Sequence, residues 1–261
     1  LRLSVARSQL PSAEFGGHDG NVNAVVRISR HLDGLPLAPE LAAARTRSLS
    51  PAQILDRLSE RFRLLTTADR TASNRQQTLL STIEWSYGLF GPDEQLLFRR
   101  LGVFAADFAI SSAEHVCAGE GIDEFDVADL LMALVDKSMV TTESAADGTT
   151  RFRLLETLRE YARHLLRDTG EWDRIRLRHA NHYAALASEL QAQQRSGDLG
   201  GALGRFQQDE ADLRDSLRYC LGDGHLTMAG QLVGGLGYLW YTSGQHREGL
   251  QWCEELFALE P

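Results

Sequence analysis

Apolar side chains recur at helical spacing through most of this 261-residue sequence, and short Gly-containing breaks divide the pattern into segments. Only at residues 138–154 does the pattern change, to two short runs on either side of Asp147-Gly148. An Asp-Gly pair between such runs is typical of a β-hairpin turn. Because helices and strands need different apolar periods, the sequence predicts a mainly α chain with one small hairpin.

Residues 1–76 have the pattern of a small helical domain. An apolar stripe over residues 22–32 ends at Asp33-Gly34, where glycine tolerates a left-handed backbone. Pro36 then begins a second helix, a position at which its missing N–H costs nothing. A third helix follows, and the polar residues 66–76 are predicted to form a linker.

Residues 77–168 have the pattern of a winged helix, in which several short helices are followed by a hairpin. The expected helices lie at 77–87, 92–101, 111–117, 126–137 and 156–166, and the expected strands at 138–143 and 150–154. Ser111 and Glu114 have the spacing of a capping box, which predicts that Ser111 begins its helix.

Residues 172–261 are predicted to be entirely helical, with helices at 175–194, 203–221, 226–241 and 247–259. Helix pairs of this size are typical of tetratricopeptide-like repeats, and we expect a truncated array of them. Trp240, Tyr241 and Trp252 could line a ligand groove, but their helical spacing favours the core of the repeats.

Charge divides the chain in the same way. Residues 1–78 carry 11 basic and 7 acidic side chains, residues 79–150 carry 3 and 13, and residues 151–261 carry 13 and 16. The acidic middle part is unsuited to nucleic acid, which attracts basic surfaces. The three cysteines are widely spaced and indicate buried thiols. We expect a cytoplasmic protein without a membrane span, because no apolar run is long enough for one.

Several short motifs stand in a fixed order along the chain. They are Leu32-Asp-Gly-Leu-Pro-Leu-Ala38, Glu40-Leu-Ala-Ala-Ala-Arg45, Arg61-Phe-Arg-Leu-Leu65, Arg75-Gln-Gln-Thr-Leu79, Trp85-Ser-Tyr87, Leu101-Gly-Val-Phe104, Leu134-Val-Asp-Lys-Ser138 and the run Arg151–Ala162. Each motif is weak, but the ordered set resembles the NB-ARC or STAND class of ATPase transcriptional regulators. These include the bacterial LuxR-type and AfsR-like proteins, some with a cyclase domain. The resemblance covers residues 1–260.

The resemblance implies a helical ARC-type subdomain in residues 1–76, in which Pro36 packs against adenine with Gly34 and Leu35 beside it. It also implies ATP or ADP with Mg in a longer parent protein that has a P-loop domain upstream of this chain. The chain itself has no P-loop, because its single lysine, Lys137, follows no Gly-rich turn. Because the chain opens on Leu1 and not on Met, we expect it to be a fragment of a longer protein. Because the P-loop is missing, we expect this fragment to bind no cofactor by itself.

Two positions depart from the family pattern, Pro39 and Leu155. In the family, a histidine of the winged helix often contacts the β-phosphate, and Leu155 stands in its place here. The departure argues against direct phosphate sensing by this winged helix.

Catalytic and metal-binding patterns are weak. No nucleophile elbow or zinc-binding pair of histidines is present in the sequence. His179 and His182 could be metal ligands on one helix face, but a solvated or capped pair is the better interpretation without a third ligand. Glu156 and Glu160 lie among arginines and indicate a surface ion-pair lattice. We therefore expect the chain not to be an enzyme.

Two functional hypotheses remain. The first is a regulatory fragment of a nucleotide-switched signalling protein. In it, helical repeats that bind a protein or small-molecule effector are coupled to an ATPase core, and DNA is contacted only through another domain. The second is a winged-helix protein that binds DNA directly. Residues 122–137 carry five carboxylates against Lys137 alone, which favours the first hypothesis.

Overall fold

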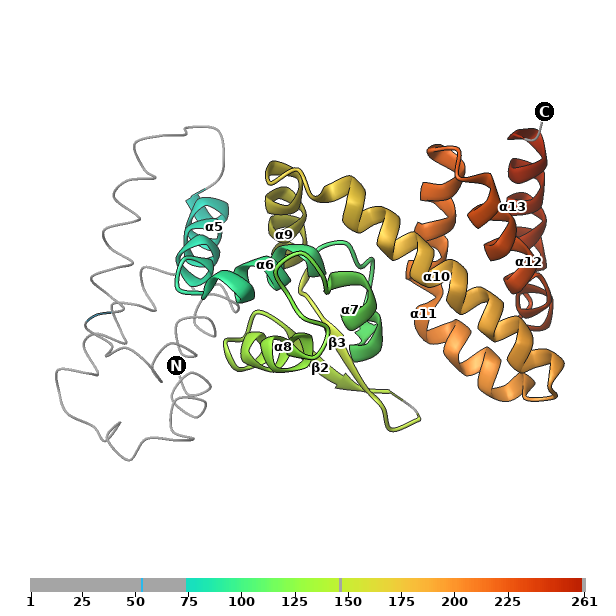
Figure 1. Cartoon of the computed structure of the whole chain (residues 1–261), viewed down its shortest axis with the longest axis horizontal. Coiled ribbons are helices and arrows are strands. Elements are labelled where there is room, and N and C mark those ends of the chain that lie inside the picture. Colours follow the sequence, from blue (N-terminus) through green and yellow to red (C-terminus); the bar gives the residue numbers. More distant parts are fainter. Residues whose placement is uncertain (1–52, 54–73, 146, 260–261) are drawn as a thin grey trace. The chain divides into compact units, whose positions relative to one another are not determined.

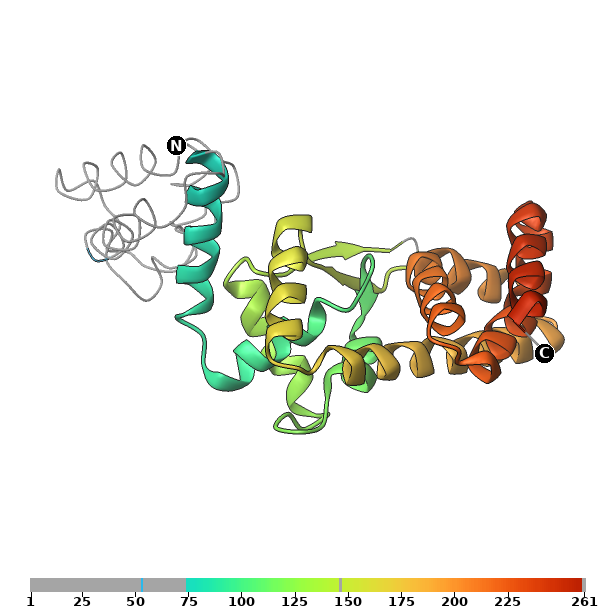
Figure 2. The ribbon, with the colours of Figure 1, turned by 90° about the horizontal axis from the view of Figure 1, so that it is seen from above.

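The computed structural model describes residue 53 and residues 74–145 and 147–259. This part of the chain is mostly helical and contains one small antiparallel sheet (Figures 1 and 2), which confirms the predicted fold class. The helices predicted before residue 63, and with them Gly34, Leu35 and Pro36, lie outside the described residues. The chain divides into two compact units, residues 1–95 with 130–140 and residues 96–129 with 141–261.

In the first unit, helix α5 (Asn74–Tyr87) leads through a tight turn to the start of α6 (Pro92–Leu101). α5 begins three residues before its predicted start and buries Ile83 and Trp85. Lys137 bonds to Glu94, and its ammonium lies 5.2 Å from the centroid of the Phe90 ring. The sole lysine of the chain is therefore engaged within its own unit.

The winged helix consists of α6, two further helices, three strands and a final helix. They are β1 (Phe108–Ala109), α7 (Ile110–Cys117), α8 (Asp126–Asp136), β2 (Thr141–Ser144), β3 (Thr150–Arg153) and α9 (Glu156–Asp168). The sheet order is β1-β3-β2, with both pairs antiparallel. Gly148 takes a φ of 82° in the hairpin turn, the left-handed conformation for which the Asp-Gly pair was assigned to a turn.

The short strand β1 was not predicted, and it changes the start of α7. Ala109 pairs with Arg151 in the sheet and is also the N-cap residue of α7, without any side-chain cap bond. The capping box predicted from Ser111 is therefore wrong, because the strand runs directly into the helix and leaves no free turn to cap. Phe108 of β1 stacks on Phe104 with 4.3 Å between ring centroids, in the core of the winged helix.

Four helices form the C-terminal part: α10 (Trp172–Arg195), α11 (Leu199–Gly222), α12 (Leu226–Thr242) and α13 (His246–Leu259). α10 packs on α7 of the winged helix and on α11 and α12, and α12 packs on α13 (Figure 1). Glycines with positive φ stand at the three breaks, at Gly197, Gly224 and Gly244. The predicted division into four helices is confirmed, and their likeness to tetratricopeptide repeats stays a prediction.

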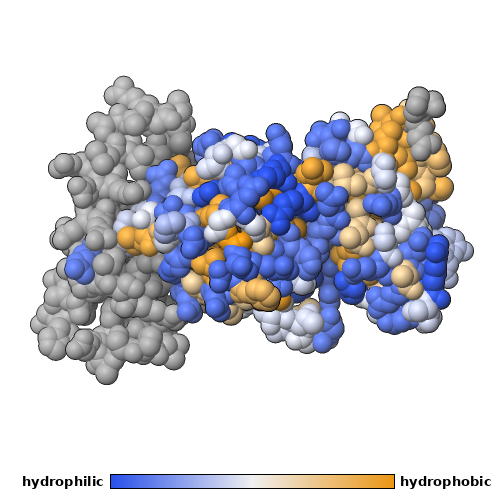
Figure 3. All heavy atoms as spheres, viewed as in Figure 1, coloured by the Kyte–Doolittle hydropathy of each residue, from blue (hydrophilic) through white to orange (hydrophobic). Residues whose placement is uncertain are grey.

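The three aromatic residues predicted in the core of these helices differ in burial. Trp240 is buried, Trp252 is half-buried and Tyr241 is 70% exposed. The prediction is therefore right for Trp240 and wrong for Tyr241. Figure 3 shows apolar side chains gathered over α13, where Leu250 and Phe257 are among the exposed residues. No helix in the described ranges is long and apolar enough to cross a membrane.

One glycine of α12 is required by close helix packing. A Cβ at Gly235 would lie 2.5 Å from the carbonyl oxygen of Ala187 on α10, closer than atoms can approach. Gly230, Gly234 and Gly237 have no atom within 4 Å of such a Cβ. Only Gly235 therefore supports the close approach of α10 and α12.

We predict opposite effects for two glycine substitutions on α12. Gly235→Ala should lower the free energy of unfolding by about 1–3 kcal/mol, because the added methyl overpacks the α10–α12 contact. Gly237→Ala, the matched control, should raise it by up to about 1 kcal/mol through helix propensity. Urea unfolding followed by circular dichroism measures both, and equal effects would contradict the assigned contact.

Candidate regulatory junction

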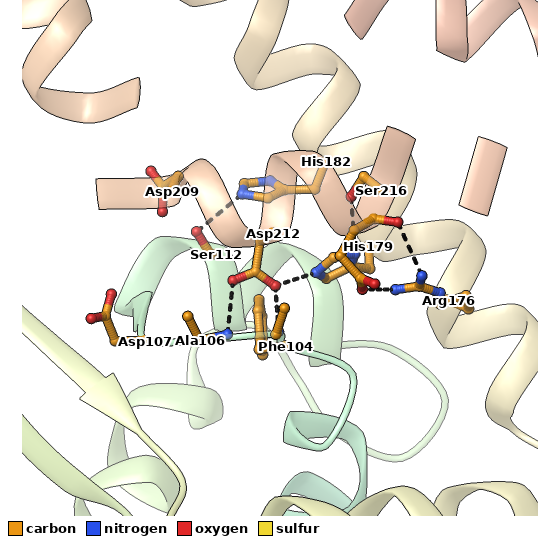
Figure 4. A network of polar contacts seen from close by, with 12 residues as sticks. Phe104, Ala106, Asp107, Ser112, Arg176, His179, His182, Asp209, Asp212 and Ser216 are labelled. Atoms are coloured by element: carbon orange, nitrogen blue, oxygen red, sulfur yellow. Dashed lines mark hydrogen bonds and ion pairs between the residues drawn. The ribbon is translucent and has the colours of Figure 1, made fainter. Parts of the chain in front are cut away.

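The winged helix and the C-terminal helices meet at a buried polar cluster within the second compact unit. We call it the junction cluster and define it as Asp107, Arg151, His179, Asp209, Asp212 and Ser216, and Figure 4 labels all of these except Arg151. Asp107 and Arg151 come from the winged helix, and the other four come from α10 and α11. Five of the six side chains are buried, so their polar groups must be paired within the protein.

Asp212 of α11 holds the loop before β1. Its carboxylate accepts hydrogen bonds from the backbone N–H of Ala105 at 2.6 Å and of Ala106 at 3.3 Å. These two amides precede the strand and have no partner in the sheet. The carboxylate has two acceptor oxygens, so it can accept a hydrogen bond from each amide at the same time. Hydrogen bonds to a charged carboxylate are stronger than those between neutral groups. Asp212 therefore fixes the start of the sheet against α11.

His179 of α10 connects Asp212 to a second residue of α11. Its Nε2 lies 2.8 Å from the Asp212 carboxylate, and its Nδ1 lies 3.1 Å from the Ser216 hydroxyl. These partners assign the tautomer in which Nε2–H donates to Asp212 and Nδ1 accepts from Ser216. The ring also packs edge-on to Phe104, with 5.5 Å between centroids. The solvated state predicted for His179 is therefore wrong, because the side chain is buried.

Ser216, His179 and Asp212 are the residue types of a hydrolytic triad, but their arrangement does not support catalysis. In a triad the serine faces Nε2 of the histidine, whereas here it faces Nδ1. All three residues are fully buried, and the Asp212 oxygens are already bonded to backbone amides. The set has no access for a substrate, so it is a structural connection between α10, α11 and the winged helix.

Arg151 of β3 forms the second half of the cluster. It donates from Nε to the Asp107 carboxylate at 2.6 Å and from a terminal nitrogen to the Asp209 carboxylate at 2.7 Å. The same nitrogen reaches the backbone carbonyl of Gln208 at 3.1 Å. Burial raises the pKa of the Asp209 carboxyl, and Arg151 opposes that shift. A guanidinium with planar donors suits this site, because it joins Asp107, which precedes β1, to Gln208 and Asp209 of α11.

Three arginines along one stretch of α10 extend the contact. Arg174 pairs with Glu120, which follows α7, and Arg178 donates to the backbone carbonyls of Ala118 and of His115, the latter at 2.9 Å. Arg176 instead pairs with Asp215 of α11. Helix α10 is therefore bonded to the residues at the end of α7 through Arg174 and Arg178, and to α11 through Arg176.

Helix α8 has the place in the order of elements at which we expect a helix that enters the major groove. Its exposed side chains are Asp126, Asp129, Met132 and Asp136, and Phe125 just before it is 90% exposed. None of these residues is basic. This surface presents carboxylates where a DNA-reading helix needs arginine or lysine for phosphates and bases.

The hairpin turn, which corresponds to the wing, contacts α11. Gln208 donates to the Asp147 carboxylate at 3.0 Å. Hydrogen bonds from Thr149 and then Gln208 lower the pKa of Asp147 to about 2, so the wing carries a negative charge at neutral pH. Of the arginines of β3, Arg151 is buried in the junction cluster, and Arg153 is exposed.

Other predicted site residues are not brought together. Among the described residues no group of three His, Cys, Asp or Glu side chains could hold a metal ion. Arg159 bonds to Glu156 and to the Ala105 carbonyl, and Arg163 bonds to the Gly102 carbonyl at 2.8 Å. The predicted surface lattice is therefore wrong in part, because these arginines hold a loop of the winged helix. Leu155 is the N-cap residue of α9.

Sequence patterns did not identify Asp212, Arg151 or the buried Arg100 as important. Arg100 donates to the carbonyls of Cys117 at 2.7 Å and Gly119 at 2.6 Å, and to Glu171 at 2.9 Å. The available signal was a charged residue on the apolar side of a predicted helix, which Arg100 and Asp212 both are. Without the fold, no partner could be assigned to either.

Comparison with known proteins agrees with this architecture. Residues 91–167 match the family described as the winged helix-turn-helix domain. A Mycobacterium tuberculosis protein provisionally named an HTH-type transcriptional regulator is 44% identical over 236 residues, which are 90% of this chain and 26% of the relative. A Mycobacterium bovis protein with the same kind of name matches equally well.

A second Mycobacterium tuberculosis protein, which is uncharacterized, is 38% identical over 183 residues, covering 70% of this chain and 46% of the relative. The chain therefore spans about a quarter to a half of the length of these relatives. No solved structure matches the chain.

We predict that Asp212→Asn destabilises the junction. The new NH₂ group would face a backbone N–H or the His179 Nε2–H, which leaves a buried donor unpaired. The free energy of unfolding should fall by about 1–3 kcal/mol. Asp223→Asn, at the exposed end of α11, is the matched control and should leave it nearly unchanged. Urea unfolding at neutral pH decides the question, and equal stability of both variants would contradict the role of Asp212.

Proposed function

We propose that the chain is a regulatory part of a transcriptional regulator, in which the winged helix is held by the C-terminal helices and does not read DNA itself. The junction cluster carries this proposal. It places Asp212 and Asp209 of α11 against the loop and strands of the winged helix, so a movement of the C-terminal helices is transmitted to the sheet. The relatives named as HTH-type transcriptional regulators support the regulatory role.

In the longer protein, we propose a nucleotide switch. An upstream P-loop domain of the same chain would bind ATP or ADP with Mg, and Gly34, Leu35 and Pro36 would lie on the adenine side. A protein or small-molecule effector on the C-terminal helices would shift the winged helix between held and released positions. Such an effector acts only through its different affinity for the two positions. DNA would be bound by another domain, and this part would be non-catalytic.

Direct DNA binding by the winged helix is the second candidate. The match of residues 91–167 to the winged helix-turn-helix domain and the exposed Arg153 on β3 favour it. The charges of α8 and of the wing oppose it, because phosphates would meet Asp126, Asp129 and Asp147. Lys137 and Arg151, which could contact phosphates, are already paired with carboxylates.

The two candidates predict different results in a DNA-binding measurement. Fluorescence anisotropy of labelled duplex DNA with the purified chain, at about 50 mM salt to favour electrostatic contacts, should show no saturable binding. Arg153→Gln tests the one exposed arginine of the sheet, and Arg195→Gln at the exposed end of α10 is its control. Salt-dependent binding that is lost in Arg153→Gln and kept in Arg195→Gln would establish direct DNA binding.

The nucleotide switch is tested in the longer protein. Pro36→Ala should weaken ADP binding measured by calorimetry, because the alanine methyl offers less surface to adenine than the pyrrolidine ring. We expect a loss of about 3- to 10-fold, which corresponds to roughly 0.6–1.4 kcal/mol. Pro51→Ala, at the start of another predicted helix, is the control for loss of a helix-initiating proline. Equal ADP affinity in wild type and Pro36→Ala, with the fold intact, would refute this role.

A further inference from the structure

A cavity beside the junction cluster has the chemistry of an anion-binding site. It has a volume of about 590 Å³ and lies between α7 of the winged helix and α10 and α11. This size falls within the usual range for small-molecule sites. Seven polar side chains line it: Ser111, His115, Arg178, Asn181, His182, Glu189 and Arg205. All of its walls belong to the second compact unit.

The charged groups of the cavity are mainly cationic. Arg178 comes from α10 and Arg205 from α11, and Glu189 is the single carboxylate in the lining. Glu189 lies 3.4 Å from Arg205, and both side chains are about half exposed, at 63% and 46%. Exposed ion pairs of this kind contribute little free energy, so an incoming anion can replace Glu189 at Arg205. Arg178 is bonded only to neutral carbonyls, which leave its charge uncompensated.

The two histidines form an aromatic wall beside these arginines. The rings of His115 and His182 are stacked with 5.5 Å between centroids. His115 Nδ1 is bonded to the Ser111 carbonyl at 2.7 Å, and His182 Nε2 lies 3.1 Å from the Ser112 hydroxyl. Burial lowers the pKa of His182 to about 4, so this ring is neutral at neutral pH. The positive charge of the cavity therefore comes from Arg178 and Arg205, beside this wall.

We propose that this cavity binds a small molecule bearing a phosphate or carboxylate group. Guanidinium groups bind such oxyanions through parallel hydrogen bonds, and Asn181 and Ser111 supply further polar contacts. A ligand here touches the winged helix and the C-terminal helices together, so it stabilises their contact by an amount that grows with ligand concentration. The site thus gives a chemical class to the effector of the proposed function, on which this regulatory meaning rests.

Calorimetric titration of the purified chain tests the site. The probes are inorganic phosphate, a sugar phosphate and a dicarboxylate at matched ionic strength, with the corresponding neutral sugar as a control. Phosphate-specific and carboxylate-specific ligands are distinguished by which probe binds. We expect saturable binding of at least one anion and none of the neutral sugar. No saturable binding of any anion would overturn the proposal.

Substitution of two arginines of α11, one in the cavity and one outside it, tests where the anion binds. Arg205→Gln should weaken binding at least 10-fold, whereas Arg218→Gln should leave it unchanged. Arg218 is a matched control, because it lies outside this cavity and is also only weakly paired, at 3.5 Å from Asp215. Equal binding by wild type and Arg205→Gln would place the anion elsewhere and overturn the proposal. Failure of this test leaves the DNA measurement unaffected, so the cavity and the proposed function can fail separately.

Discussion

The carboxylate of Asp212 is the contact on which the arrangement of the second compact unit depends. It accepts from two successive backbone amides of the winged helix and from the His179 ring, all of which are far from Asp212 in the sequence. A buried carboxylate is costly unless every lone pair is used, so its surroundings are narrowly defined. Asp212 of α11 therefore holds the two amides of the loop before β1, and Arg159 and Arg163 of α9 bond to the carbonyls of the same loop.

Arginines form further polar contacts between the winged helix and the helices that follow it. Arg100 and Arg99 of α6 both bond to Glu171, at the turn between α9 and α10. Arg174 and Arg178 then hold α10 against the end of α7. Because α10 is a single helix of 24 residues, about 36 Å long, it carries these contacts to α11 and α12 without a hinge.

The sequence predicted local structure well and long-range polar contacts poorly. α6 has its predicted bounds, and the hairpin was found, because apolar period, helix caps and turn residues are local signals. The strand β1 was missed, because two residues carry no period. His179 and Asp212 could not be paired in advance, since 33 positions separate them and only packing of α10 on α11 brings them together.

The polar nature of the junction suits a contact that opens and closes. A hydrogen bond formed on folding replaces bonds to water, so each contributes only about 0.5–1.5 kcal/mol net, and somewhat more where a charge takes part. The junction cluster therefore holds the winged helix by a few kcal/mol, and its groups regain water when it opens. Typical couplings between two ligand sites are about 1–3 kcal/mol. The effector that we propose beside Arg205 would need only a coupling of this size to shift the equilibrium.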